Sequence, residues 1–248
     1  MKSPLTISLV IPVFNEEDTI ERCLDAIAAQ TVYPDQVIIV DNNCTDATIR
    51  LVKNHGNYEI LRQYTQGIGI AAATGYDAAT SDIIVRCDAD SVAPVDWIER
   101  IHRQFSTNTQ LDALTGPGEF YDTNRLQAML AKYLYMEAYF YLVGLALTQP
   151  PLFGSNFAMR GATWRAVRSH IHADKNDIHD DIDLSYHLIG RSVMYDRSLV
   201  IGISARPLKS FSGMMLRYRR GLQSIVLHKD SYSFVSLYRR KLATALKR

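Results

Sequence analysis

The chain has 248 residues, of which 47% are hydrophobic and 21% charged, an ordinary composition for a soluble globular protein. Its three cysteines, Cys23, Cys44 and Cys87, have neither C-x-x-C pairing nor zinc-ligand spacing, which argues against a secreted disulfide scaffold and favours a reducing compartment. The net charge of +1 hides an asymmetry: residues 206–248 contain eleven Lys or Arg and one acid, whereas residues 1–205 contain 16 basic and 25 acidic groups. A basic tail on an acidic body predicts an anionic partner for the tail.

The first half of the chain alternates short apolar runs with helical patterns. Residues 6–13 (TISLVIPV) form an apolar run typical of a strand buried on both faces, and the acidic NEED that follows argues against a signal peptide. Because strand–helix–strand units of this length require crossovers, the pattern predicts an α/β fold with a mostly parallel sheet flanked by helices. Further strands are predicted at 36–40, 58–63 and 82–88, and helices at 20–28, 45–53, 70–79 and 95–105.

The second half predicts a helical segment over 123–147 and a basic helical tail. The most apolar part, residues 138–147, is about half the length of a membrane-crossing helix. Since no linker interrupts the chain, we expect one domain over 1–205 and a tail over 206–248. The tail has the composition of a segment that lies on an anionic membrane surface, and the alternative is a solvated basic face packed on the acidic body. No recognised nucleic-acid-binding module accompanies the charge, so we expect no nucleic-acid partner.

Acidic residues follow two of the predicted strands. Asp41 comes directly after the strand at 36–40, and Asp88 and Asp90 end the strand at 82–88. Residues two apart in an extended segment point the same way, so Asp88 and Asp90 can converge on one site. Two carboxylates at this spacing can hold Mg²⁺ or Mn²⁺, which can bridge phosphate oxygens. The alternative is a turn that opens with helix-capping acids.

Six ordered motifs carry a resemblance to a known family. They are LVIPVFNEEDTIERCLDAI, VIIVDNNCTDAT, QGIGIAAATGYDAA, VRCDAD, GSNFAMRGATWRAV and HDDIDLSYHLIGRSVMYD. Together they resemble the family 2 glycosyltransferases of the GT-A fold over residues 6–200. The resemblance implies a Rossmann-like sheet, a nucleotide-sugar-binding half over about 1–118 and an acceptor and catalytic half over 119–205. It also implies a nucleotide-diphosphate sugar donor and a glycan or lipid-linked acceptor.

The resemblance assigns donor-side roles. Asp41 matches the acid that accepts a hydrogen bond from the base edge, with Asn43 beside it where many relatives carry a second Asp. Asp88 and Asp90 match the family's D-x-D, with Asp90 as the direct metal ligand. Glycines in the third motif allow close backbone approach to the donor, or are ordinary turn and packing residues. The remaining donor-side candidates are Pro12, Phe14 and Glu16 in the first loop, Gly69 with Gly67 and Gly75, and Arg217 at the diphosphate.

The acceptor side is assigned in the same way. Gly154, Ser155 and Asn156 match a loop that contacts the sugar and acceptor, and Asp181 matches the catalytic base. Asp180 replaces the family's usual Glu, which leaves its role open. Both acids could instead favour a helix N-terminus electrostatically. Trp164 is at helical spacing from Val167 and is expected in the core rather than on a sugar face.

Histidines near this motif raise a separate metal hypothesis. His170, His172 and His179 lie among carboxylates, but H-x-H alone is a weak pattern and predicts no dedicated zinc site. His179 is a candidate auxiliary ligand of the metal at Asp88 and Asp90.

The residues and the resemblance together predict a metal-dependent, non-processive glycosyltransferase of cell-envelope glycan synthesis, and the resemblance implies that the reaction inverts the anomeric configuration. We expect it in the cytoplasm, peripheral on the inner face of the cell membrane. The segment RYRRG at 217–221 is not the Q-x-x-R-W of processive synthases. Two alternatives remain open: a polyprenyl-phosphate glycosyl synthase, which needs no strong base, and a non-catalytic nucleotide-binding protein on the same fold.

Overall fold

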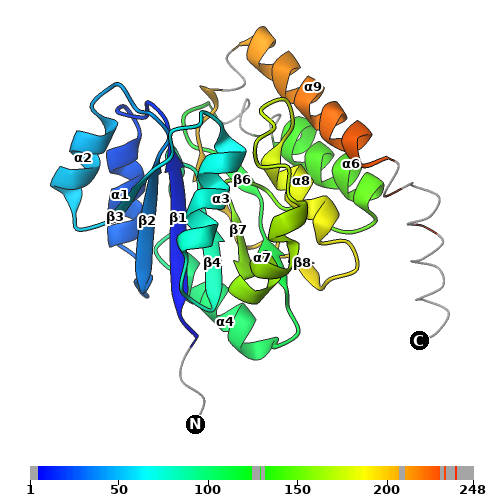
Figure 1. Ribbon diagram of the computed structural model, residues 1–248, viewed down its shortest axis with the longest axis horizontal. Helices are drawn as coiled ribbons and strands as arrows, with labels where there is room; N and C mark the ends of the chain where they lie inside the picture. The colour runs from blue at the N-terminus through cyan, green and yellow to red at the C-terminus, as the bar shows by residue number, and fades with distance from the viewer. Residues whose placement is uncertain are drawn as a thin grey trace.

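The computed structural model is organised around a seven-stranded sheet with helices on both faces (Figure 1). It describes residues 5–124, 129, 132–206, 210–229, 232 and 238. The strand order is β3-β2-β1-β4-β7-β5-β8, and β7 runs antiparallel to both of its neighbours. The mostly parallel sheet predicted from the sequence is therefore confirmed. The strands are β1 (Ile7–Val13), β2 (Gln36–Asp41), β3 (Glu59–Arg62), β4 (Ile83–Arg86), β5 (Ala113–Thr115), β7 (Phe157–Arg160) and β8 (Val193–Tyr195).

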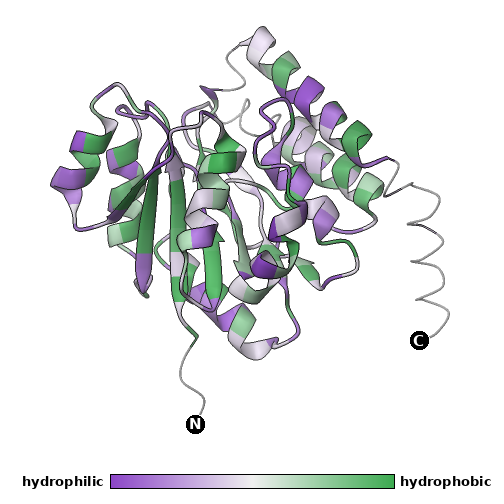
Figure 2. Ribbon diagram, in the orientation of Figure 1, coloured by the Kyte–Doolittle hydropathy of each residue, from purple (hydrophilic) through white to green (hydrophobic). Residues whose placement is uncertain are grey.

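The two faces of the sheet bury separate sets of apolar side chains. On one face Leu9 and Ile11 pack with α1 (Ile20–Ala28), α2 (Thr48–His55) and α4 (Trp97–Thr107). On the other face Val10 packs with α3 (Ile68–Ala78), α7 (Gly161–Val167) and α8 (Asp180–His187). This alternation along β1 is the period of two expected of a strand covered on both sides. Figure 2 shows the hydrophobic residues concentrated along the central strands.

The second half adds a small sheet and a helical group to this core. Strands β6 (Gly118–Phe120) and β9 (Ile201–Ile203) pair in parallel, and a π-helical turn, η1 (Lys132–Glu137), leads into α6 (Ala138–Leu147). Leu147 of α6 packs with Ile182 and Tyr186 of α8 and with Ile225 of α9 (Phe211–His228). Helix α8 is thus held between the main sheet, α6 and α9. A short 3₁₀ turn, η2 (Arg168–His170), follows α7.

Two predicted boundaries shift for local reasons. Helix α2 begins at Thr48 rather than at residue 45, because Oδ1 of Asp46 accepts both the N–H and the hydroxyl of Thr48, at 3.0 and 2.6 Å. Strand β2 continues to Asp41, which pairs in register with Val13. Of the predicted basic tail, residues 211–228 form α9, and the remainder beyond 229 lies outside the described residues except for Tyr232 and Tyr238.

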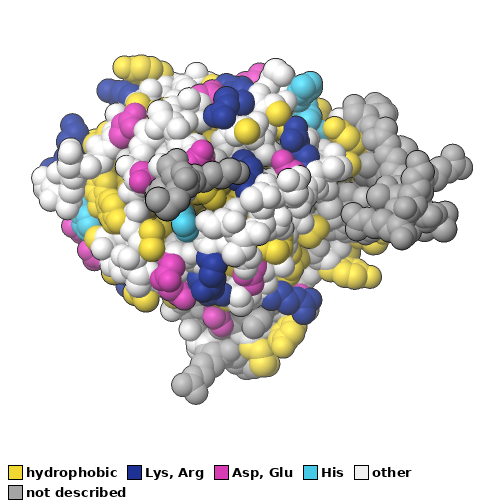
Figure 3. All heavy atoms as spheres, turned by 90° about the horizontal axis from the view of Figure 1, so that it is seen from below, with side chains coloured by type: hydrophobic (Ala, Val, Ile, Leu, Met, Phe, Trp, Pro, Cys, Tyr) yellow, Lys and Arg dark blue, Asp and Glu magenta, His cyan; other side chains and the backbone are white. Residues whose placement is uncertain are grey.

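The acids predicted to form the site lie at one end of the sheet. At the lower end of Figure 1, acidic and basic side chains are interspersed over the surface (Figure 3). The acids predicted to form the site lie at the end of β2 and after β4, at the opposite end, where the carboxyl ends of parallel strands leave room for ligands. Among the described residues, no helix combines the length and apolarity needed to cross a bilayer.

Candidate active site

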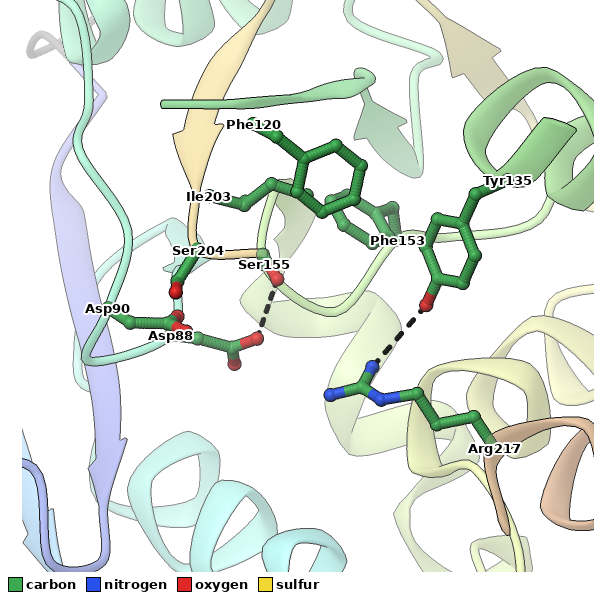
Figure 4. A pocket seen from close by; sticks show the side chains of 9 residues that line it. All are labelled: Asp88, Asp90, Phe120, Tyr135, Phe153, Ser155, Ile203, Ser204 and Arg217. Carbon is green, nitrogen blue, oxygen red and sulfur yellow. Dashed lines mark hydrogen bonds between the residues drawn. The ribbon is translucent and has the colours of Figure 1, made fainter. Parts of the chain in front are cut away.

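A pocket lies at the carboxyl ends of the strands, where the loop after β4 meets the β6–β9 sheet and α9 (Figure 4). It has about 380 Å³ of free space that is open to solvent. Two carboxylates and one guanidinium face it, beside a wall of aromatic and aliphatic side chains. Such a combination is typical of sites for charged small molecules. The lining consists of Asp88, Asp90, Phe120, Tyr135, Phe153, Ser155, Ile203, Ser204 and Arg217.

A buried arginine connects the two acidic motifs. Arg86 ends β4 with 2% of its surface exposed; its Nη1 donates to Oδ2 of Asp180, and its Nη2 donates to Oδ1 of Asp88 at 3.2 Å. Nη1 also contacts the Tyr76 hydroxyl at 3.4 Å. Burial opposes the charge on Arg86, but Asp180 and the other acids hold its pKa well above the ordinary value. Arg86 therefore ties the loop after β4 to the first turn of α8.

Asp88 and Asp90 have different partners within the pocket. Oδ2 of Asp88 accepts the Ser155 hydroxyl at 2.6 Å, whereas Oδ2 of Asp90 lies 3.3 Å from Nη2 of Arg206. The same nitrogen lies 2.7 Å from both carboxylate oxygens of Glu16. Burial and the charge of Asp88 raise the pKa of Asp90 to about 6, although Arg206 opposes this shift. The incompletely compensated carboxylates are hard oxygen donors, and they fit a divalent cation such as Mg²⁺ or Mn²⁺.

Asp180 and Asp181 begin α8 beside the pocket wall. Oδ2 of Asp181 accepts the backbone N–H of Gly154 at 2.8 Å and lies 3.5 Å from the Tyr139 hydroxyl. A Cβ atom at position 154 would come within 3.2 Å of this oxygen, so glycine permits the close approach. Burial and the charge of Asp180 raise the pKa of Asp181 above the usual carboxyl range. A carboxylate with a raised pKa is a stronger base.

The end of β2 forms a second polar group. Asp41 is 8% exposed, and its Oδ1 accepts the N–H of Cys44 at 2.8 Å. Asn42 is 3% exposed; its amide donates to two carbonyls of the loop after β3, and its Oδ1 accepts the N–H of Gly67 at 2.8 Å. Asn43 has a φ of 68°, in the left-handed region that Asn tolerates. Asn42 thus joins the loop after β2 to the start of α3.

The first-loop and glycine candidates lie around this edge. Glu16 is joined to Asp90 through Arg206, Phe14 is 46% exposed, and Pro12 is buried within β1. Gly69 packs closely on the loop before α8, where an added Cβ would lie 3.0 Å from the Ala173 carbonyl. The other two glycines serve packing and turn geometry: a Cβ at Gly75 would overlap Val10, and Gly67 has a φ of 152° and adjoins Asn176.

Of the predicted site residues, only Asp88, Asp90, Ser155 and Arg217 line this pocket, and Asn156 and His179 have other partners. Asn156 is fully buried: its amide oxygen accepts Nε1–H of Trp97 at 2.9 Å, and its nitrogen donates to the Leu199 carbonyl at 2.6 Å. Asn156 therefore supports the loop from inside rather than contacting an acceptor. His179 is not among the residues that line the pocket, and its Nε2 lies 3.0 Å from the carbonyl of Arg217. It is not placed as a ligand beside Asp88 and Asp90. Trp164 is 2% exposed, as expected of a core residue.

Sequence reasoning missed four residues that organise the site. They are Arg86, Arg206, Asn42 and Tyr139. The role of Arg86 could have been predicted from the sequence, because a cation inside a buried apolar run requires buried acidic partners. Arg206 is separated from Glu16 by 190 residues, so only the fold brings them together.

The sequence is similar to those of known glycosyltransferases. The family model described as glycosyl transferase family 2 matches residues 8–168. Glycosyltransferase AglE of Haloferax volcanii is 34% identical over 122 residues, which cover 46% of this chain and 40% of AglE. The O-antigen chain rhamnosyltransferase RfbN of Salmonella typhimurium is 31% identical over 109 residues, which cover 41% and 34%. The chain therefore spans less than half the length of these curated relatives.

Solved structures show the same fold. S. aureus TarS in complex with UDP-GlcNAc superposes with a TM-score of 0.62 at 16% identity, covering 82% of this chain and 59% of that one. Glucosyl-3-phosphoglycerate synthase from Mycobacterium tuberculosis, in complex with Mn²⁺, UDP and glucosyl-3-phosphoglycerate, superposes with a TM-score of 0.58 at 20% identity, covering 83% and 74%. These likenesses confirm the predicted GT-A architecture.

Replacing Arg86 tests whether the buried ion pairs hold the site together. We expect Arg86→Met to lower the free energy of unfolding by about 3–5 kcal/mol, because Asp88 and Asp180 would lose a buried partner. The control is Arg168→Met, which removes an exposed ion pair with Asp77 and should cost about 1 kcal/mol or less. Urea unfolding of both variants provides the measurement. Equal costs for the two would show that Arg86 has no special structural role.

Proposed function

Because the chain belongs to glycosyl transferase family 2, we propose that it transfers a sugar from a nucleoside-diphosphate donor to a hydroxyl of a glycan or lipid-linked acceptor. The observation that carries the proposal is the meeting of Asp88, Asp90 and Arg217 in one pocket, with Asp181 beside its wall. Residues 1–118 would bind the donor and residues 119–205 would position the acceptor. The reaction proposed is non-processive and inverts the anomeric configuration.

The donor would lie across the carboxyl ends of β2, β1 and β4. Its base would meet Asp41, whose carboxylate suits a donor N–H of the base edge. UDP is favoured because the TarS and glucosyl-3-phosphoglycerate synthase structures hold UDP or UDP-GlcNAc, and Mn²⁺ accompanies UDP in the second of these. Asp88 and Asp90 would hold Mg²⁺ or Mn²⁺, which supplies positive charge to the leaving diphosphate. Arg217 would add a second positive charge from α9.

Asp181 would act as the base. It takes the proton of the acceptor hydroxyl while that oxygen forms its bond to the anomeric carbon. The bond from that carbon to the diphosphate oxygen breaks at the same time, and the diphosphate leaves with the electron pair. The Gly154 N–H fixes the Asp181 carboxylate, and burial together with the charge of Asp180 raises its pKa. Arg86 donates to Asp180 and holds it in place.

The helix after the catalytic region offers a surface for an anionic membrane. On α9, Met215, Tyr218, Leu222 and Val226 recur at helical spacing and are between 51% and 65% exposed. Ser224 and His228, on the opposite side, are buried against α8. An exposed apolar stripe beside arginines is the pattern of a helix that lies in a membrane interface. A lipid-linked acceptor would be reached from such a surface.

The metal-dependent donor site is tested by thermal shift. We expect UDP with Mn²⁺ to raise the Tm of the wild-type chain by about 5 °C, since ligand bound only to the folded state stabilises it. Asp90→Asn should abolish the Mn²⁺-dependent part of this shift. The matched control Asp25→Asn changes an exposed acid on α1 and should leave the shift intact. A full Mn²⁺-dependent shift in Asp90→Asn would remove the proposed role of Asp90.

The base is tested by kinetics. We expect Asp181→Asn to lower kcat by about 10²–10⁴-fold with little change in the UDP–Mn²⁺ thermal shift, because the base acts in the chemical step. In the wild type, kcat/KM should fall as the pH drops through the pKa of Asp181, and this acid limb should lie above the ordinary carboxyl range.

The two alternatives give different results in the same assay. Nearly full transfer by Asp181→Asn onto a polyprenyl phosphate would favour a lipid-phosphate acceptor. UDP binding without sugar transfer or donor hydrolysis in the wild type would favour a non-catalytic protein.

Membrane contact is tested by co-sedimentation with vesicles that contain anionic lipid. We expect the double variant Leu222→Ser, Val226→Ser to bind about tenfold or more weakly, because each side chain contributes apolar burial. Val95→Ser, an exposed apolar position before α4, is the control. Unchanged binding of the double variant would exclude the α9 stripe as the membrane contact.

A further inference from the structure

A second group of metal-ligating side chains lies on the other side of α8, away from Asp88 and Asp90. Asp183 and His187 are one helical turn apart on α8, His172 comes from the preceding loop, and His228 ends α9. One ligand atom from each of the four lies within 4.8 Å of all the others. The side chains of Asp183 and His228 are 1% and 3% exposed.

The hydrogen-bonding pattern leaves two acceptor atoms facing each other at the centre of this cluster. Nδ1 of His228 donates to the Ser224 carbonyl at 2.8 Å, so Nε2 of a neutral His228 carries a lone pair. That Nε2 lies 3.1 Å from Oδ1 of Asp183 and 3.4 Å from Nε2 of His187. Two lone pairs facing each other in a buried site are unfavourable unless a cation lies between them or the imidazole is protonated.

The spacing of the ligand atoms suits a tetrahedral cation. Four ligands about 2.0–2.1 Å from a zinc ion are about 3.3 Å from one another. From Oδ1 of Asp183, the distances are 2.7 Å to Nδ1 of His172, 3.1 Å to Nε2 of His228 and 3.7 Å to Nε2 of His187. The outer contacts also match a metal site, because the Ser224 carbonyl fixes the His228 tautomer and the His172 N–H donates to Oδ2 of Asp183.

We propose that His172, Asp183, His187 and His228 bind a structural zinc ion that fastens α9 to α8. Three imidazoles and one carboxylate form a closed set that favours Zn²⁺ over the hard cations suited to Asp88 and Asp90. The ion would lock the helix that carries Arg217 to the helix whose first turn carries Asp181.

Within the described part of the chain, no further histidine, cysteine or acid joins these four ligands. The rings of Tyr186 and His228 are stacked at 4.3 Å, and Tyr232 packs nearby. The ring of His170 lies 6.0 Å from that of His187. Of the three histidines that the sequence placed near one another, His172 alone joins the cluster; His170 remains outside it, and His179 contacts α9 through the Arg217 carbonyl.

The first experiment measures metal directly on the full chain. Elemental analysis after purification without added metal should find about one zinc per chain. After removal with a chelator, Zn²⁺ should raise the Tm by about 5–10 °C, whereas Mg²⁺ should not. Co²⁺ added to the stripped chain should give the intense visible absorption of a tetrahedral site. These readouts are independent of transferase activity, so they distinguish this proposal from the proposed function.

Variants identify the ligands. His187→Gln and His228→Gln should each lose the zinc content and the Zn²⁺-dependent Tm shift, while His170→Gln, the matched control, should keep both. Asp90→Asn should also keep both, since Asp90 belongs to the other pocket. If the His variants do not fold, the Co²⁺ spectrum and zinc content of the wild type decide the question. A stripped wild-type chain that binds neither Zn²⁺ nor Co²⁺, and whose stability falls as pH rises through the histidine range, would overturn the proposal in favour of a protonated cluster.

Discussion

The buried guanidinium of Arg86 is the interaction on which the rest of the site depends. An arginine with 2% of its surface exposed stays charged only beside carboxylates, and it finds them in the loop after β4 and at the start of α8. The same ion pairs therefore stabilise the interior and connect the loop after β4 to the first turn of α8. Neither acidic motif is free to move independently of the other.

Helix α8 connects three parts of the molecule. Its first turn carries Asp180 and Asp181, its apolar side chains pack on the sheet and on α6, and the turn that follows presents Asp183 and His187 to α9. A change in how α9 sits on α8 would alter the position of Arg217 relative to Asp181. The histidine cluster thus lies where fastening two helices has a direct consequence for the pocket.

Acids outnumber the arginine that pairs with them at the carboxyl ends of the strands. Glu16, Asp88 and Asp90 converge at one place, and Arg206 offsets only part of their charge. Burial and the charge of Asp88 both raise the pKa of Asp90. In the proposed reaction a divalent cation would supply the rest. Arg206 contacts Glu16 and Asp90 through the same nitrogen, so it joins the first loop to the loop after β4.

The sequence by itself determined the layers of the fold and the acids at the strand ends. Periodicity fixes which segments are strands, and parallel strands place Asp41, Asp88 and Asp90 at one edge. Contacts between distant segments were decided only by the tertiary structure. Arg206 reaches Glu16 and His228 reaches Asp183 across long stretches of chain. Asn156, predicted to contact the acceptor, and His179, predicted as an auxiliary metal ligand, instead bond to backbone carbonyls. A motif states which groups are present, but their hydrogen-bonding partners depend on which surfaces the packed helices and strands bring together.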